Sequence, residues 1–193
     1  MNNNMGFRIL TGFITTVLLV MMFQVNIWAQ FESSAESAIL IDAVTGQVLY
    51  EKNPDTAMPP ASITKIMTLL IGFEALEQEK VKWDDPVIVS EKSWRTGGSE
   101  MFLLVGDKAS FGDIMTGISV VSANDGCVAL AEQLYGSEEA FVGVMNNRAR
   151  ELGLSNSRFV NSNGLPAEGH IMSARDISTL ARHLIMRHPK ILE

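Results

Sequence analysis

Apolar residues recur every three to four positions through much of the chain after residue 60, the spacing of helices that bury one face. Serine, aspartate, glycine and proline mark where such segments begin and end. We therefore expect helices within the ranges 62–73, 111–119, 125–135, 137–153 and 173–189. The first range is apolar nearly all round, which is typical of a helix inside a core.

Strands are predicted mainly near the beginning of the chain. The ranges 38–42 and 47–51 are rich in Ile, Leu, Val and Tyr, and the short connection between them ends at a glycine. They are expected to form a β-hairpin, and further short strands are expected at 87–90 and 101–104. A lone hairpin is marginal in water and needs more strands or a helix to cover it. The chain as a whole is predicted to be α+β.

Composition limits the chain to one modest core. Its 193 residues are 47% hydrophobic, which leaves no room for a second large domain. The net charge is −7, from 15 basic and 22 acidic residues. Nucleic acids and anionic membrane surfaces are bound by basic faces, so we expect no nucleic-acid partner.

The first 29 residues have the composition of a secretory signal peptide. A polar segment with one arginine, 1–8, precedes an almost uncharged apolar stretch, 9–28, and Ala29 is a small residue suited to cleavage. About 20 apolar residues also suffice to span a bilayer, so an uncleaved anchor is the alternative. In either case we expect residues 30–193 to be exported, to the periplasm or the outer face of the cytoplasmic membrane.

The single cysteine and the three histidines predict no further chemistry. Cys127 has no partner for an internal disulfide and lies among apolar helix positions, so we expect a buried, unreactive thiol. His170, His183 and His188 share no ligand spacing with cysteine or paired acids. Neither a metal site nor a cofactor is expected.

Ser62 and Lys65 are the first candidates for catalytic residues. They stand at positions i and i+3 of the predicted apolar helix, so the hydroxyl and the amine lie within mutual reach. A lysine base can activate a serine nucleophile in this way without histidine. Burial would lower the pKa of Lys65 and free its lone pair to accept a proton. The alternative is a chance match of four residues in which Lys65 reaches out to water.

Ser122 and Asn124 are the second pair of candidates. They lie in a turn between two predicted helices, where a hydroxyl and a carboxamide can point into one cleft. Serine can relay a proton, and asparagine can hold a substrate amide and orient an ammonium. The alternative is an ordinary serine/asparagine turn, which these residues favour for local reasons.

Taken together, the two motifs resemble those of the serine D-alanyl-D-alanine carboxypeptidases, the small penicillin-binding proteins of the S11 peptidase type. The resemblance implies a β-lactamase/DD-peptidase-like fold, in which a helical body accompanies a sheet that begins with the N-terminal hairpin. Residues 30–193 would then be part of a DD-peptidase catalytic domain. Other pieces match the same family in the same order: 38–42, 45–46, 49–53, 98–102, 105–107, 136–141, 163–166, 169–170 and 174–176.

The resemblance also implies a role for each candidate residue. Ser62 would be the nucleophile that forms an acyl-enzyme ester, and Lys65 its general base. Ser122 would pass a proton toward the leaving amine, and Asn124 would bind the substrate amide and help to hold Lys65. Ala123 replaces the commoner glycine or aspartate between them, but that side chain has no assigned chemistry.

The third motif of the family, Lys-Thr-Gly on an edge strand, does not occur among the 193 residues. The family pattern places it downstream of Glu193, so the chain is interpreted as the front part of an enzyme whose incomplete sheet has an open edge. The motif contributes one oxyanion donor, and loss of one such donor costs roughly 100- to 1,000-fold in rate. We therefore expect this polypeptide to be catalytically impaired.

By resemblance, the full-length enzyme would remove the terminal D-alanine from peptidoglycan stem peptides, and β-lactams would acylate the same serine. Two alternatives stay open: an endopeptidase acting on cross-links of the same polymer, and a non-catalytic envelope protein that uses the helical body for binding. Peripheral association with the membrane is a further expectation. Glu168 and His170 are interpreted as a solvated loop carboxylate and a structural histidine, not as catalytic groups.

Overall fold

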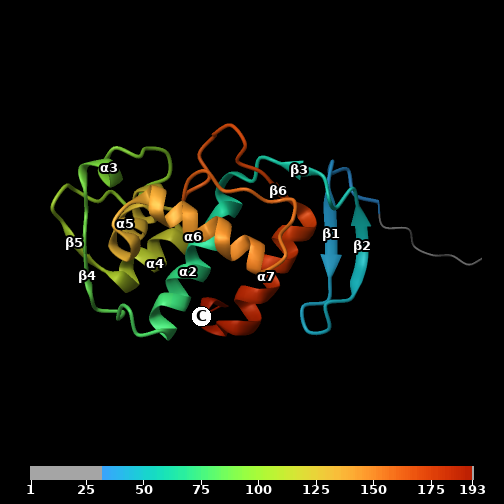
Figure 1. The fold of residues 1–193 in the computed structure, drawn as a ribbon, viewed down its shortest axis with the longest axis horizontal. Helices are drawn as coiled ribbons and strands as arrows, with labels where there is room; N and C mark the ends of the chain where they lie inside the picture. The colour runs from blue at the N-terminus through green and yellow to red at the C-terminus, as the bar shows by residue number, and fades with distance from the viewer. Residues whose placement is uncertain (1–31, 193) are drawn as a thin grey trace, which may run out of the picture. The chain divides into compact units, whose positions relative to one another are not determined.

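Helix α2 (Lys65–Glu77) runs through the middle of the helical body and is largely buried (Figure 1). In this computed structural model residues 32–192 are described, and the chain divides after residue 32 into two units, of which the second carries every element named below. α2 contacts each of the other long helices. Its apolar side chains explain this position, because a helix without a polar face gains by burying all its faces.

The helices around α2 are α4 (Phe111–Val120), α5 (Asn124–Tyr135), α6 (Glu138–Glu151) and α7 (Ala174–Arg187). Three of them begin where a serine hydroxyl accepts a backbone N–H of the first turn. These capping residues are Ser110, Ser137 and Ser173. The predicted helices are confirmed, with ends that differ from expectation by a few residues.

The strands form three separate antiparallel pairs. They are β1 (Ala38–Ile41) with β2 (Val48–Lys52), β3 (Ala57–Met58) with β6 (Met172–Ser173), and β4 (Pro86–Ile88) with β5 (Lys108–Ser110). The first pair confirms the predicted hairpin. Within residues 32–192 the fold is therefore α+β with small, incomplete sheets, as the sequence predicts.

The prediction of a strand at 101–104 is wrong, whereas the one at 87–90 overlaps β4. The backbone N–H groups of Met101 and Leu103 donate to the carboxylate of Asp125, at 3.1 and 3.3 Å, and not to a neighbouring strand. Phe102 between them has a φ of 58°, in the left-handed region that strands do not use. The apolar pattern of the segment could not reveal this, because the acceptor lies on α5, far along the chain.

The core lies between the helices and includes aromatic side chains from α4, α6 and the loop after α6. Its largest fully buried members include Phe111, Phe141, Phe159, Met67 and Leu70. The Cys127 thiol is buried as expected, and desolvation raises its pKa. Packing in this core fixes α2 against α5, the two elements on which the candidate site depends.

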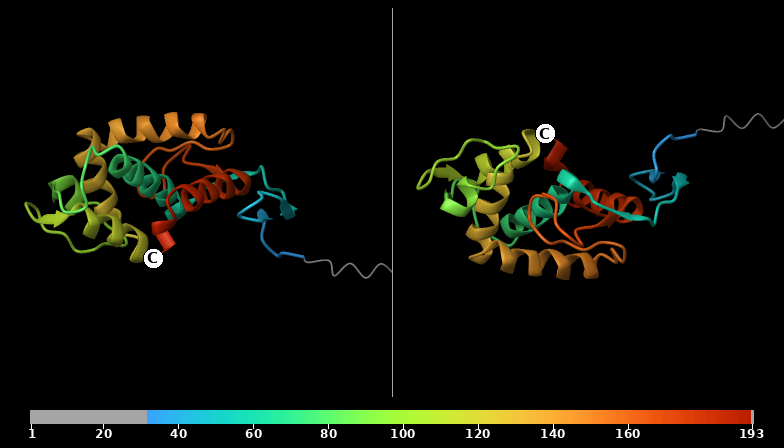
Figure 2. Two further views of the ribbon diagram at one scale, coloured as in Figure 1. Left: turned by 90° about the horizontal axis from the view of Figure 1, so that it is seen from below. Right: turned by 90° about the horizontal axis from the view of Figure 1, so that it is seen from above.

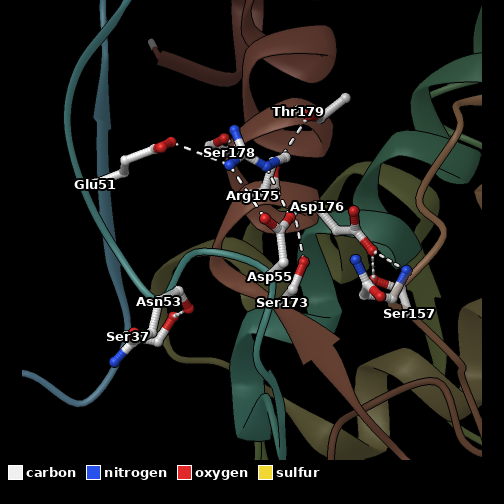
Figure 3. Close-up of polar contacts among 11 residues, drawn as sticks. Ser37, Glu51, Asn53, Asp55, Ser157, Ser173, Arg175, Asp176, Ser178 and Thr179 are labelled. Carbon is white, nitrogen blue, oxygen red and sulfur yellow. Dashed lines mark hydrogen bonds and ion pairs between the residues drawn. The ribbon is translucent and has the colours of Figure 1, made fainter.

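Two arginines of α7 attach the hairpin to the helical body. Arg175 forms ion pairs with Asp55 at 2.7 Å and with Glu51 at 3.0 Å (Figure 3). Arg182 donates to two backbone carbonyl oxygens of the hairpin turn, each at 2.8 Å. Figure 2 shows the hairpin beside α7 from two opposite sides. These pairs are exposed to solvent, so each contributes little stability alone and their effect is mainly to orient the hairpin.

The sequence does not predict the strands β3, β5 and β6, nor three short helical elements. These helical elements are α3 (Glu91–Trp94) and the 3₁₀ turns η1 (Ala61–Thr64) and η2 (Pro189–Leu192). The predicted signal peptide, residues 1–29, lies outside the described residues. Among the helices of residues 32–192, none combines the length and the apolar character needed to cross a membrane.

Candidate active site

Ser62 and Lys65 lie on adjoining elements, with the serine in η1 and the lysine at the first position of α2. In a 3₁₀ turn residues i and i+3 are eclipsed, so the tight entry to α2 brings the two side chains closer than an α-helix would. The Nζ atom of Lys65 lies 3.1 Å from Oγ of Ser62. The pairing that the sequence predicts is therefore present in the structure.

The amine of Lys65 is held inside the protein, and its residue is only 4% exposed. Nζ lies 2.7 Å from Oδ1 of Asn124 and 2.8 Å from the backbone carbonyl oxygen of Asn163. Among the described residues no carboxylate forms an ion pair with it. Desolvation therefore dominates, and burial lowers the pKa of Lys65 below its ordinary value.

The three neighbours of this amine can also serve its neutral form. A neutral amine has two N–H bonds and one lone pair, and the oxygens of Asn124 and Asn163 can only accept hydrogen bonds. If they take the two N–H bonds, the lone pair is left facing the hydroxyl of Ser62. The arrangement can therefore draw a proton from Ser62, which a lysine reaching out to water could not do.

Asn124 is oriented by a loop that precedes β5 in the chain. Its Nδ2 donates to the carbonyl oxygen of Gly97 at 2.9 Å, and its backbone N–H donates to that of Ser99 at 2.7 Å. These contacts assign the amide so that Oδ1 faces Lys65. Gly98 has a φ of +82°, and a Cβ added there would come within 2.6 Å of Nδ2 of Asn124. The loop can approach Asn124 this closely only because residue 98 is glycine.

Ser122 lies in the predicted turn between α4 and α5, in a conformation that the sequence does not reveal. Its φ is 58°, in the left-handed region that costs energy for residues other than glycine. Its Oγ is buried and has no hydrogen-bond partner among the described residues. Ser122 lines a cavity of about 370 Å³ together with Ser62, Lys65 and apolar side chains of α2, α4 and α7. The structure thus brings all four predicted site residues to one region.

The loop 161–165 overlaps a piece that matches the family, 163–166, but residue types alone do not reveal how it takes part in the site. The backbone of Asn163 contacts Lys65 directly. The next residue, Gly164, has a φ of +89°, and a Cβ there would lie 1.8 Å from the carbonyl oxygen of Ala61. Glycine is therefore required where this loop crosses η1.

His170 and Glu168 do not join the site chemistry. Nδ1 of His170 accepts the backbone N–H of Val160, which leaves Nε2 as the donor to the hydroxyl of Thr64, 2.8 Å away. Desolvation lowers the pKa of His170, so the neutral ring that this pattern needs is favoured. Glu168 is exposed on the loop. In residues 32–192 no cluster of histidine, cysteine and acidic side chains is suited to hold a metal ion.

Residues 24–193 match the profile of the peptidase S11 family, D-alanyl-D-alanine carboxypeptidase. The chain belongs to this family. The resemblance carried by the two motifs and the ordered matching pieces is thereby confirmed.

Two relatives illustrate the range of this carboxypeptidase family. D-alanyl-D-alanine carboxypeptidase DacF of Bacillus subtilis is 45% identical over 157 residues, which cover 81% of this chain and 40% of the relative. A D-alanyl-D-alanine endopeptidase of Pseudomonas aeruginosa is 35% identical over 153 residues, which cover 78% of this chain and 47% of the relative. The chain thus spans less than half the length of these curated relatives.

Solved structures of carboxypeptidases and penicillin-binding proteins share the fold. The D-alanyl-D-alanine carboxypeptidase DacD from Francisella tularensis matches with a TM-score of 0.82 and 38% identity, over 83% of this chain and 39% of that one. Penicillin-binding protein D2 from Listeria monocytogenes, in the ampicillin-bound form, matches with a TM-score of 0.74 and 30% identity, over 84% of this chain and 66% of that one. The predicted DD-peptidase-like fold class is therefore confirmed.

Proposed function

We propose that the protein is a serine-type D-Ala-D-Ala carboxypeptidase that removes the terminal D-alanine from peptidoglycan stem peptides through an acyl-enzyme. The observation that carries this proposal is the buried amine of Lys65, held by two carbonyl acceptors and 3.1 Å from the hydroxyl of Ser62. A serine with a desolvated lysine beside it has the base it needs for nucleophilic attack. Membership of the carboxypeptidase family supports the same reaction.

In the proposed reaction the proton of Ser62 moves to the lone pair of Lys65 while Oγ bonds to the carbonyl carbon of the penultimate D-alanine. The C–N bond to the terminal D-alanine then breaks, and the proton reaches the leaving amine through Ser122. Water hydrolyses the Oγ ester and releases the shortened peptide. Ser122 suits this relay because its Oγ is buried, unpaired within the described chain, and lines the same cavity. Asn124 would hold the substrate amide beside Lys65.

We further propose that the polypeptide of residues 1–193 turns over weakly by itself. The Lys-Thr-Gly motif does not occur in it. A polypeptide without this motif would lack one hydrogen-bond donor of the oxyanion site. Acylation needs Ser62 and Lys65, which are present, whereas stabilisation of the tetrahedral intermediate needs the donors around the oxyanion. The defect should therefore slow both formation and hydrolysis of the ester without displacing the nucleophile.

β-Lactams are proposed as ligands of the same serine, because their ring amide presents an acyl carbon to the nucleophile. The relative from Listeria monocytogenes has been solved with ampicillin bound. A protein with this substrate would act outside the cytoplasm, at the periplasm or the outer face of the membrane, with peripheral membrane association as a further proposal. The net charge of −7 argues against a nucleic-acid partner.

An endopeptidase acting on cross-links is the second candidate, and the relative from Pseudomonas aeruginosa is the observation that favours it. Both reactions attack the same kind of acyl carbon and differ in the leaving amine. A digest of purified peptidoglycan distinguishes them, because a carboxypeptidase releases free D-alanine and an endopeptidase converts cross-linked dimers to monomers.

The proposal is tested by incubating the protein with a fluorescent penicillin, both as expressed from its complete gene and as residues 1–193. In the protein expressed from its complete gene we expect covalent label on Ser62 and no label in Ser62→Ala. Ser155→Ala, a control at an exposed serine, should label like the wild type. Absence of label from the whole protein, with no D-alanine released from stem peptide, would favour the non-catalytic binding protein. Stoichiometric, rapid labelling of residues 1–193 would contradict the proposed impairment.

A further inference from the structure

Glu138 is a largely buried carboxylate at the first position of α6, with a side chain 12% exposed. One of its oxygens, Oε1, accepts both the backbone N–H of Ser162 at 3.0 Å and its hydroxyl at 2.7 Å. Ser162 is fully buried, so its N–H and hydroxyl have no contact with solvent in the folded structure and depend on this one oxygen. The carboxylate thus fixes the backbone of Ser162 as well as its side chain.

The other oxygen of Glu138 has a different partner. Oε2 lies 3.1 Å from Nζ of Lys92, which also pairs with Glu139 at 2.7 Å. Glu139 is 76% exposed and, among the described residues, forms no ion pair or hydrogen bond with the 161–165 loop. The two neighbouring carboxylates therefore share a cation, but only Glu138 reaches the loop.

The segment Ser162–Asn163 is held from the opposite side by α2. The hydroxyl of Thr68 donates to the carbonyl oxygen of Ser162 at 2.6 Å, and Nζ of Lys65 contacts the carbonyl oxygen of Asn163 at 2.8 Å. Thr68 follows Lys65 by three positions, so both side chains leave α2 on one face. Two consecutive carbonyl groups, those of Ser162 and Asn163, thereby accept hydrogen bonds from α2, while Glu138 accepts the backbone N–H of Ser162.

We propose that Glu138 is a positioning residue, which acts through Ser162 to keep the Asn163 carbonyl against Lys65 and so directs the lone pair of Lys65 at Ser62. This inference rests on the proposed function. Glu138 touches neither the nucleophile nor the base. Its effect on them passes through the backbone of Ser162 and Asn163, which is held by Glu138 at the N–H of Ser162 and by α2 at the two carbonyl oxygens.

Removal of the Glu138 carboxylate leaves the buried N–H and hydroxyl of Ser162 without an acceptor. An unpaired buried donor is costly, so the segment shifts or admits water. The Asn163 carbonyl then no longer takes an N–H of Lys65, and the amine is free to rotate its lone pair away from Ser62. Water beside the amine also relieves its desolvation, which moves its pKa back up toward the ordinary value.

The test measures the rate of acylation by a fluorescent penicillin across the pH range, with the protein expressed from its complete gene. In Glu138→Ala we expect acylation at neutral pH to slow by about tenfold or more, because small misplacements of reacting groups are costly. We also expect the acid limb of its pH profile to move to higher pH. Glu138→Gln should restore both, since its amide oxygen can still accept from Ser162.

Two further variants distinguish an effect of Glu138 on the position of the Ser162 backbone from effects of its charge and of protein stability. Glu139→Ala removes the neighbouring partner of Lys92 and should acylate like the wild type. Ser162→Ala loses only the hydroxyl contact and should move the profile in the same direction as Glu138→Ala, by less. Thermal unfolding of each variant is recorded alongside, and if Glu138→Ala does not fold, Ser162→Ala and Glu138→Gln decide the question.

The inference is overturned if Glu138→Ala and Ser162→Ala both keep the wild-type pH profile, or if Glu138→Gln loses as much activity as Glu138→Ala. The second outcome would mean that the charge and not the contact with Ser162 matters. A wild-type protein without label on Ser62 would refute the proposed function and this inference together. A labelled wild type with unchanged variants would refute this inference alone.

Discussion

Nζ of Lys65 and Oδ1 of Asn124 lie 2.7 Å apart although the two residues are separated by 59 positions in the chain. Each is the first residue of its helix, and each helix is buried in the common core. The contact therefore depends on how α2 and α5 pack, and any change in that packing would alter the surroundings of the amine. It also places a neutral acceptor, not a carboxylate, beside Lys65, which leaves desolvation as the dominant influence on its pKa.

Asn124→Asp tests this relationship directly. A carboxylate beside Lys65 would raise the pKa of the lysine by about one to three units and hold it as an ammonium. We expect acylation by penicillin at neutral pH to slow, by up to about tenfold for each unit by which the pKa rises, since less of the amine is then neutral. Asn147→Asp, which adds the same charge at an exposed position of α6, is the control. Equal labelling of both variants would contradict the need for a neutral amine at Lys65.

Lys65→Arg distinguishes a base from a fixed positive charge. Arginine keeps the charge but does not lose its proton in proteins, so it cannot accept one from Ser62. We expect covalent labelling of Ser62 to be lost, while Lys80→Arg, at an exposed lysine, labels like the wild type. Circular dichroism and thermal unfolding establish that the Arg variant is folded. Labelling at a wild-type rate would show that the charge of Lys65, and not its lone pair, is what acylation requires.

Two glycine substitutions are expected to have opposite effects on stability. At Gly164 a Cβ would lie 1.8 Å from the carbonyl oxygen of Ala61 and φ is +89°, so Gly164→Ala should lower the free energy of unfolding by at least about 3 kcal/mol. At Gly143, inside α6, a Cβ meets nothing within 4 Å, so Gly143→Ala should raise the free energy of unfolding by about 0.5–1 kcal/mol. Urea denaturation measures both. Similar stabilities of the two variants would contradict the close crossing of the loop and η1.

The pH dependence of stability should follow the histidines. Burial lowers the folded-state pKa of His170, His183 and His188 below the ordinary value of 6.5. Below that value the unfolded chain binds more protons than the folded one, so the free energy of unfolding should fall as the pH falls. Their stabilising contribution is fully present above pH 6.5 and is lost as the pH drops through the folded-state values.

His170→Gln should weaken this dependence without abolishing it, because the other two histidines keep their contributions. Urea denaturation at intervals between about pH 5 and about pH 8 measures the slope. A slope unchanged in His170→Gln would mean that the pKa of this histidine is the same in the folded and unfolded states. A steeper slope would contradict the direction of its pKa shift.

Much of the fold could be predicted because its signals are local. The capping serines Ser110, Ser137 and Ser173 act within the first turn of their own helices, and the hairpin is set by two short strands and the turn between them. The pairing of Ser62 with Lys65 is also local, since three positions along one turn suffice to bring the two side chains together. The segment 101–104 could not be predicted correctly because a buried acid on α5 overrides its apolar pattern.

The sequence by itself determined which side chains are candidates for the site, because residue types and short spacings are properties of neighbouring positions. Only the tertiary structure decided the burial of Lys65 and the partners of its amine. Its second carbonyl acceptor belongs to the backbone of Asn163, 98 positions away. Every residue has a backbone carbonyl, so residue type cannot indicate which one contacts Lys65. The left-handed backbone of Ala61 and Ser122 is likewise not indicated by residue type, since neither alanine nor serine adopts it by local preference.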